Sequence, residues 1–361
     1  MGLSIGIVGL PNVGKSTLFN AITKNQVQAE NYPFCTIDPN VGVVAVPDER
    51  LEKLAAVIPT KQVVPAVVEF IDIAGLVKGA AQGEGLGNQF LSHIRSCDAI
   101  AEVIRVFNDT KVMHVEGKID PLSDMETIKT ELILADLDTV KRKKDRTEKE
   151  LKANPKAQET LEIIIKIEQG LNEGTPVRDI SLSDKDKEQI REMNLLTAKP
   201  HIYVFNGDEE HLTKTREIIQ DMAINENNLV VISAKIEGEL NQLTDKEKRD
   251  YLKELGQEGS GLDNLIRKGF ELLGLSTYFT AGEREIKAWT IKKGWTAPKA
   301  AGVIHGDFEK GFVKAETVCW KDLYDNKGWA GAKTAGKVRL EGREYLVKDG
   351  DVMVFKFAVS H

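Results

Sequence analysis

The feature that most restricts how this 361-residue chain can fold is the stretch S-I-G-I-V-G-L-P-N-V-G-K-S-T at residues 4–17. Residues 4–8 form a short apolar run, which predicts a buried strand. The pattern G-x-x-x-x-G-K-[ST] follows at 9–16, and apolar residues at helical spacing come directly after it. A strand, a glycine-rich loop and a helix in this order predict a phosphate-binding loop in an α/β fold.

Each part of this loop has a chemical task. The glycines let backbone N–H groups close around phosphate oxygens, and the helix start directs its positive dipole end at them. The Lys15 ammonium can reach the β- and γ-phosphates and so act in catalysis, and the Ser16 hydroxyl can ligate Mg²⁺. The residues that fit the motif itself are Gly9, Gly14, Lys15 and Ser16.

A second element, V-V-E-F-I-D-I-A-G at residues 67–75, predicts a strand that ends in Asp72-x-x-Gly75. In phosphate-switch proteins such an Asp holds Mg²⁺ through water, and the Gly N–H contacts the γ-phosphate. We therefore expect Asp72 to bind Mg²⁺ through water and Gly75 to act in catalysis. Thr36, in Y-P-F-C-T-I-D-P, is the expected second metal ligand, although several other threonines could serve.

The residue after Gly75 is Leu76, where Ras-like proteins have a glutamine that orients the attacking water. Because leucine cannot orient water, intrinsic hydrolysis should be slow, or another group must position the water. Gln82 and His114 are the candidates, since each could hydrogen-bond a water molecule. A lone histidine is more often structural, so this assignment stays open.

The chain resembles the YchF/Obg-like ATPase family over essentially its whole length. The motifs that carry the resemblance are G-L-P-N-V-G-K-S-T, D-I-A-G-L-V-K-G-A with G-L-G-N-Q-F-L, F-N-G-D-E, Y-F-T-A-G-E-R-E-I-K-A-W-T-I-K-K-G and A-A-G-V-I-H-G-D-F. It implies an ATPase that prefers ATP over GTP, with a helical insert and a C-terminal TGS domain associated with ribosome or RNA contact. It also implies Mg²⁺ ligation by Ser16 and Thr36, and base reading by Asn206 and Glu209. The phosphate-binding residues that it implies are Asn12, Val13, Gly14, Lys15, Ser16 and Thr17. Asn12 is shared with related proteins that use K⁺, so K⁺ is a further candidate cation.

The base-reading segment is H-I-Y-V-F-N-G-D-E-E-H-L at residues 201–212. In GTP-binding proteins Asn-Lys-x-Asp stands here, and the aspartate accepts from two donors of guanine. Here Gly207 replaces the lysine and Glu209 the aspartate. The longer Glu209 side chain can swing away, and Gly207 removes the stem that would lie along the base. Adenine would leave an aspartate without a partner, at a high desolvation cost.

Asn206 remains at its position, and its amide can both donate and accept, so it tolerates either purine. The S-A-K segment, which is Ser233, Ala234 and Lys235, is expected to cover the other edge of the base. Asp208 lies one position early for guanine, but a shift in register could bring it in. The segment therefore favours ATP without excluding GTP.

Alternating strand and helix patterns predict an α/β P-loop domain with a mostly parallel sheet, at 1–120 and 199–276. A helical insert is expected at 121–198, as a hairpin whose second helix starts after Asn154 with Pro155 in its first position. Residues 277–361 are expected to form a small β-grasp TGS domain that ends in a hairpin with a turn at Asp349-Gly350. Residues 278–361 carry 15 Lys+Arg and 11 Asp+Glu, so their net charge is 15 − 11 = +4, against −7 for the whole chain. This basic balance allows an RNA contact without requiring one.

The composition, 41% hydrophobic and 29% charged, is typical of a globular protein, and no apolar run is long enough for a membrane span. The N-terminal residues lack a signal-peptide pattern. The three cysteines, Cys35, Cys97 and Cys319, have no paired spacing, which argues against a disulfide framework. We therefore expect a cytoplasmic protein without a membrane partner, and a monomer.

Three functions fit this pattern. The first is a slow ATPase whose hydrolysis resets a switch, with the ribosome as partner. The second is a ribosome- or protein-binding adaptor in which the nucleotide is only a conformational ligand, and Leu76 favours this alternative. The third is an ordinary GTPase, which requires Glu209 to behave as aspartate. We expect the first, with ATP as substrate and Mg²⁺ as cofactor.

Overall fold

The computed structural model describes residues 3–24, 40–73, 86–107, 119–214, 217, 225–257 and 259–358. The chain divides into two compact units, one formed by Met1–Val43 with Glu69–Leu265 and the other by Val44–Val68 with Ile266–His361. Residues 44–68 therefore group with the C-terminal part of the chain. The division into three domains expected from the sequence stays a prediction.

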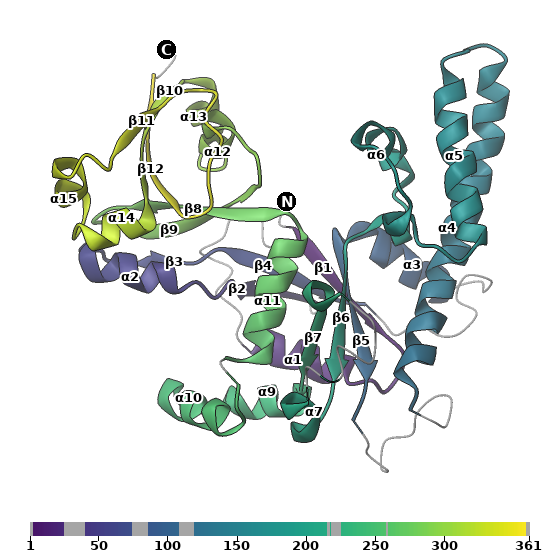
Figure 1. Cartoon of the computed structure of the whole chain (residues 1–361), viewed down its shortest axis with the longest axis horizontal. Helices are drawn as coiled ribbons and strands as arrows, with labels where there is room; N and C mark the ends of the chain where they lie inside the picture. Colours follow the sequence, from purple (N-terminus) through teal and green to yellow (C-terminus); the bar gives the residue numbers. More distant parts are fainter. Residues whose placement is uncertain are drawn as a thin grey trace. The chain divides into compact units, whose positions relative to one another are not determined.

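The first unit contains most of a six-stranded sheet, in which five neighbouring strands are parallel (Figure 1). β1 pairs in parallel with β4 and β5, and the pairs β5–β6 and β6–β7 are parallel too. Every residue of β1 and β5 is buried, as expected for central strands covered on both faces. The strands in spatial order are β2 (Val41–Ala45), β4 (Val67–Asp72), β1 (Ser4–Gly9), β5 (Ala99–Arg105), β6 (His201–Asn206) and β7 (Leu229–Ile232).

Helices lie between these strands in the chain and after the last of them. α1 packs beside α9, where Asn241 Nδ2 donates to the Ala21 carbonyl at 2.9 Å. Glu237 of α9 is buried and accepts from Ser260 Oγ at 2.7 Å and from the Gly261 N–H at 2.8 Å, so it caps the start of α11. The helices are α1 (Lys15–Thr23), α3 (Leu86–Ser96), α7 (Glu209–Thr213), α9 (Ala234–Leu240), α10 (Asp245–Glu254) and α11 (Gly261–Leu272).

An antiparallel helix pair, α4 (Pro121–Leu151) and α5 (Ala157–Asn172), stands out from the sheet (Figure 1). We call it the arm, and its apolar seam includes Val140, Ile164 and Ile167. None of the helices in the described ranges is long and apolar enough to cross a membrane. The predicted start of the second helix is wrong: α5 begins at Ala157, because residues 154–156 form a turn in which Asn154 Oδ1 accepts from the Lys156 N–H at 3.2 Å.

The second unit contains a mixed sheet in the order β11-β10-β12-β8-β9-β3. β10 pairs antiparallel with β11 and β12, β8 pairs antiparallel with β9, and β12 runs parallel to β8. Its elements are α2 (Glu49–Val57), β3 (Val63–Val64), β8 (Leu275–Ala281), β9 (Ile286–Lys292), α12 (Ala297–Gly302), α13 (Gly306–Lys310), β10 (Phe312–Cys319), α14 (Trp320–Asp325), α15 (Trp329–Thr334), β11 (Arg339–Glu341) and β12 (Asp351–Phe357). Trp289 and Trp295 pack against its core.

The C-terminal hairpin expected at Asp349-Gly350 is wrong. β12 pairs with β10, and β11 lies on the other side of β10, so the two segments are not neighbours. Asp349 Oδ1 instead accepts from the Thr277 N–H at 2.8 Å, and the Gly350 N–H donates to the Thr277 carbonyl at 2.8 Å. The Asp-Gly pair therefore fastens the chain to β8 before β12 begins.

A buried pair of titratable groups lies between β5 and β6. Glu102 Oε2 and His201 Nε2 are 2.8 Å apart, and both side chains are almost fully inaccessible. Glu102 Oε1 and His201 Nδ1 have no hydrogen-bond partner among the described residues. Burial raises the pKa of Glu102 to about 8 and lowers the pKa of His201 well below its usual value. Both groups are therefore neutral near pH 7 and share one hydrogen bond.

This pair predicts a pH dependence of stability. The pKa of Glu102 is about 8 in the folded state, against an ordinary 4.5. The contribution of Glu102 to the free energy of unfolding is therefore complete below pH 4.5 and is lost as the pH rises through 8. The lowered pKa of His201 changes the stability only below pH 6.5, which is its ordinary pKa. We expect wild type to lose about 1–2 kcal/mol between pH 6.5 and 8 relative to Glu102→Gln, which cannot ionise.

Urea unfolding of both proteins across this range measures the difference. The surface variant Glu126→Gln, which loses only an exposed ion pair with Lys129, is the control. A constant stability difference between wild type and Glu102→Gln over the whole range would show that Glu102 is already ionised at pH 6.5.

Candidate nucleotide-binding site

The predicted site residues follow strands whose carboxyl ends share one edge of the parallel sheet. β1 ends at Gly9, β4 at Asp72, β6 at Asn206 and β7 at Ile232. Parallel pairing in the order β4-β1-β5-β6-β7 brings these ends to the same side. Ligands of open α/β sheets bind at this edge.

The loop after β1 owes its shape to two residues in the left-handed backbone region. Asn12 has φ 66° and Gly14 has φ 92°, and α1 starts directly after Gly14. Among the residues that the structure describes, no side chain caps the start of α1. Its first N–H groups therefore point toward the place that an anion would take.

Gly14 is also required by packing. A Cβ on this residue would lie 2.1 Å from Asn206 Nδ2, which is far closer than any real contact. The left-handed φ adds a backbone cost for any other residue. The second glycine of the motif thus lets the loop come close to the end of β6.

Asn206 ties three segments of this edge together. Its side chain is buried; Nδ2 donates to the Val13 carbonyl at 2.9 Å, and Oδ1 accepts from the Ala234 N–H at 3.0 Å. Its carbonyl accepts from the Val106 N–H at 3.0 Å and the Phe107 N–H at 3.3 Å. The amide thus holds the phosphate loop, and whether it also contacts a base stays a prediction.

Lys15 and Asp72 form an ion pair beside the start of α1. Their side chains are only 11% and 19% exposed, so the pair is screened less than a surface pair. Ser16 and Thr17 follow in the first turn of α1 and are exposed. Thr36, Gly75, Leu76, Gln82 and His114 lie outside the described residues, so their assignments stay predictions.

The residues after Asn206 form the start of α7. The Gly207 N–H donates to the Ile232 carbonyl at 2.8 Å, and a Cβ on Gly207 would lie 2.5 Å from His211 Cβ. Asp208 caps α7 and accepts from His211 Nδ1 at 2.6 Å; partial burial opposes the ionised form, but the bonds from His211 hold the pKa of Asp208 below its usual value. Glu209 is exposed in the first position of the helix.

The segment after β7 starts α9. Ser233 caps the helix by accepting from the Ile236 N–H at 3.5 Å. Ala234 is buried and bound to Asn206, while Lys235 is exposed. The structure therefore brings the S-A-K segment to the Asn206 side of the phosphate loop.

Sequence reasoning missed the segment after β5. Arg105 is buried, its guanidinium carbon lies 4.4 Å from the Phe107 ring centroid, and its Nε donates to the Phe107 carbonyl at 3.2 Å. Phe107 Cε1 lies 4.0 Å from where a Gly14 Cβ would be. No motif marks these residues, but their place after a central strand of the sheet could have identified them.

Comparison with known proteins decides the family. A relative from Bacillus subtilis named "Ribosome-binding ATPase YchF" is 52% identical over 366 residues, covering 99% of this chain and 100% of that protein. A protein of the same name from Escherichia coli O157:H7 is 49% identical over 363 residues, with the same coverage. This chain belongs to the YchF family.

Two family models and a solved structure agree with this assignment. The MMR_HSR1 model, described as a 50S ribosome-binding GTPase, matches residues 4–136, and the YchF-GTPase_C model, described as a protein of unknown function, matches residues 275–358. "Structure of the Schizosaccharomyces pombe YchF GTPase" matches with a TM-score of 0.87 and 41% identity, over 98% of both chains. The predicted P-loop fold with a C-terminal domain and the resemblance to YchF are confirmed. The names of these relatives differ in the nucleotide, ATP or GTP.

The tie made by Asn206 predicts the effect of Asn206→Ala. The variant leaves the Val13 carbonyl and the Ala234 N–H buried without partners, at about 1–3 kcal/mol for each group. We expect a lower free energy of unfolding and at least a tenfold weaker affinity for ATP with Mg²⁺, measured by calorimetry.

The matched control is Asn241→Ala, which removes another amide that joins two elements, α9 and α1. We expect this control to lose stability but to keep its nucleotide affinity. Equal affinities for Asn206→Ala and wild type would show that the tie does not shape the site.

Proposed function

We propose that this chain is a magnesium-dependent ATP hydrolase that works as a slow nucleotide switch and associates with the ribosome. The observation that carries the proposal is the placement of Lys15 and Ser16 at the start of α1, beside Asp72 at the end of β4. The curated relatives named "Ribosome-binding ATPase YchF" support both the reaction and the partner.

The residues of this edge fit an Mg²⁺ ion bound with a nucleotide. The Ser16 hydroxyl and the Asp72 carboxylate are oxygen ligands of the kind that Mg²⁺ takes, and the ion keeps several waters. Lys15, which contacts Asp72, is the neighbour of Ser16, so both oxygen groups lie close to the loop. In the proposal Ser16 and Thr36 would ligate the ion directly, and Asp72 would hold it through water. The bound ion would neutralise phosphate charge.

The protein groups then act by electrostatics. The loop N–H groups from 12–17 and the positive end of α1 would hold the β- and γ-phosphate oxygens in a fixed place. The Lys15 ammonium would exchange its contact with Asp72 for a phosphate oxygen and stabilise the charge that grows during transfer. Leu76 offers no hydrogen bond to water, so turnover would be slow without a partner.

The same proposal includes several finer statements. Asn206, Glu209 and the 233–235 segment would favour adenine. K⁺ is a candidate second cation beside Asn12. The basic C-terminal segment, 278–361, would contribute RNA contacts on the ribosome. Ribosome association would place the chain in the cytoplasm. The proposal also takes the chain to be a monomer.

Turnover tests the role of Lys15. We expect Lys15→Ala to lose about 10²–10³-fold in the rate of phosphate release from ATP, since a preorganised charge is removed. Multiple-turnover assays with and without ribosomes, in K⁺ or Na⁺, measure the rate. Lys141→Ala, an exposed lysine of the arm, is the control.

Full activity in Lys15→Ala would refute this site assignment. Wild type that binds ribosomes in a nucleotide-dependent way but releases no phosphate would favour the adaptor function instead. A rate that rises only with ribosomes present would show that the partner completes the site, either by supplying the water-positioning group or by placing Gln82 or His114.

Paired equilibrium binding tests the base preference. We expect wild type to bind ATP at least tenfold more tightly than GTP, which is about 1.4 kcal/mol. Glu209→Asp should narrow this gap, because it restores the shorter carboxylate that accepts from guanine. Gly207→Lys is unsuitable as a test, since a Cβ there would lie 2.5 Å from His211 Cβ.

Glu210→Asp is the matched control, because Glu210 is the next exposed carboxylate of α7 and pairs with Lys214. If wild type prefers GTP, the base assignment is wrong, and the protein is a GTPase with an unusual motif.

A further inference from the structure

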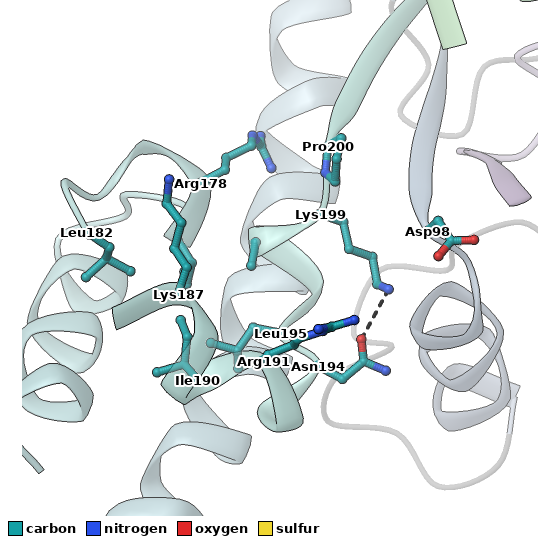
Figure 2. A pocket seen from close by; sticks show the side chains of 12 residues that line it. Asp98, Arg178, Leu182, Lys187, Ile190, Arg191, Asn194, Leu195, Lys199 and Pro200 are labelled. Atoms are coloured by element: carbon teal, nitrogen blue, oxygen red, sulfur yellow. Dashed lines mark hydrogen bonds between the residues drawn. The ribbon is translucent and has the colours of Figure 1, made fainter. Parts of the chain in front are cut away.

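A pocket of about 390 Å³ lies at the root of the arm, away from the nucleotide edge. Asp98 and residues from the stretch 177–200, which leads from the arm to β6, line it (Figure 2). We call it the arm-root pocket. It lies wholly within the first unit.

Its floor is apolar and firmly held. Val177, Ile190 and Leu195 line the pocket and are buried members of the core cluster of the arm. Leu182 also lines it and packs against that cluster. A floor made of core side chains keeps its shape when a ligand enters, which lowers the cost of binding.

Two of the four cationic side chains in the lining are already engaged. Lys199 Nζ donates to the Arg95 carbonyl at 3.0 Å, to Asn194 Oδ1 at 3.2 Å and to the Cys97 carbonyl, so all its donors are used (Figure 2). Arg178 donates to the Thr197 carbonyl at 3.5 Å. Lys199 and Arg178 therefore hold the pocket together and are not available to a ligand in the same way as an unengaged cation.

The other two cations form the rim. Lys187 is 63% and Arg191 74% exposed, and their ion pairs, with Asp184 at 3.8 Å and Glu188 at 3.5 Å, are long contacts three residues away on the same helical stretch. Such exposed pairs contribute little and exchange easily. Among the described residues that line the pocket, the carboxylate is Asp98, which accepts from the Ser4 N–H at 2.9 Å. The charged groups that the lining offers at the rim for a new partner are therefore Lys187 and Arg191, whose present pairs are weak.

An apolar centre with a charged, solvent-exposed rim is the arrangement of a small protein–protein contact. A nucleic acid fits it less well, because none of the lining residues is aromatic and the floor offers no stacking surface. A small free anion fits less well too, because the unengaged cations lie at the rim and not inside.

We propose that the arm-root pocket docks an acidic segment of a partner protein. One bulky aliphatic or aromatic side chain of that segment would fill the floor beside Leu182 and Ile190. Carboxylates on either side of it would pair with Lys187 and Arg191.

This contact is separate from the nucleotide site. Pro200 of the pocket directly precedes β6, and Asn206 ends that strand, so the two sites lie at opposite ends of β6. Six strand residues span about 20 Å. The docking proposal and the proposed function can therefore fail independently.

Selection from a phage-displayed library of random twelve-residue peptides tests the proposal, with the full chain as bait. We expect selected peptides that combine several acidic residues with a bulky apolar one. A fluorescein-labelled selected peptide, followed by anisotropy, should lose at least tenfold in affinity with Arg191→Glu and with Leu182→Ser. Its binding should weaken with added salt.

Arg142→Glu is the matched control. Arg142 is 69% exposed on α4, has a similar weak pair with Asp138 at 3.9 Å and does not line the pocket. We expect unchanged peptide affinity in this variant. Arg191→Glu changes only a surface side chain, so it keeps the test valid even if Leu182→Ser unfolds.

Three outcomes would overturn the proposal. The first is a library that yields no shared acidic and apolar pattern. The second is a selected peptide whose affinity is unchanged in Arg191→Glu. The third is a twelve-nucleotide oligouridylate that binds more tightly than any peptide and whose binding is lost in Arg191→Glu. That result would make the pocket a nucleic-acid contact.

Discussion

The buried side-chain amide of Asn206 is the interaction on which the nucleotide edge depends. One donor goes to the Val13 carbonyl in the phosphate loop, and the oxygen takes the Ala234 N–H at the start of α9. An amide is suited to this place because it donates and accepts from one rigid group. The loop can come this close only because Gly14 has no side chain, since a Cβ there would lie 2.1 Å from Asn206 Nδ2. The motif glycine and the base-motif asparagine, nearly two hundred residues apart, therefore depend on each other.

Much of the fold follows from local signals, and the failures have a shared physical cause. β1, α1 and β4 were predictable because their apolar periods and the glycines between them act over a few residues. The hairpin at Asp349-Gly350 was wrong because the partner of β12 is β10, far back in the chain. The pairing of β3 with β9 could not be foreseen for the same reason, since two residues carry too little pattern to specify a distant neighbour. Non-local strand pairing is set by the whole sheet and not by the turn.

The candidate site divides in the same way. The residues of the phosphate loop could be named from their motif, whereas the segment 105–107 has no motif and is found only through the strand order. Gly207 shows why sequence alone underdetermines the base. Its lack of a side chain fits the loss of the lysine that lies along guanine. Packing against α7 requires a glycine here too, because a Cβ on Gly207 would lie 2.5 Å from His211 Cβ. A substitution explained by packing is weaker evidence for base preference, so Glu209 carries more of that argument than Gly207.

Buried polar contacts hold the root of the arm to the stretch that leads into β6. Asp136 of α4 is fully buried and accepts from the Leu196 N–H at 2.8 Å and from both the N–H and hydroxyl of Thr197 at 2.7 Å. Lys199 then fixes the next turn to the carbonyls that end α3. Apolar packing would tolerate small slides of one surface over another, but directed hydrogen bonds to a buried carboxylate allow few alternatives. Because this stretch leads directly into β6, the same contacts fix where that strand begins, and through its length where Asn206 ends it.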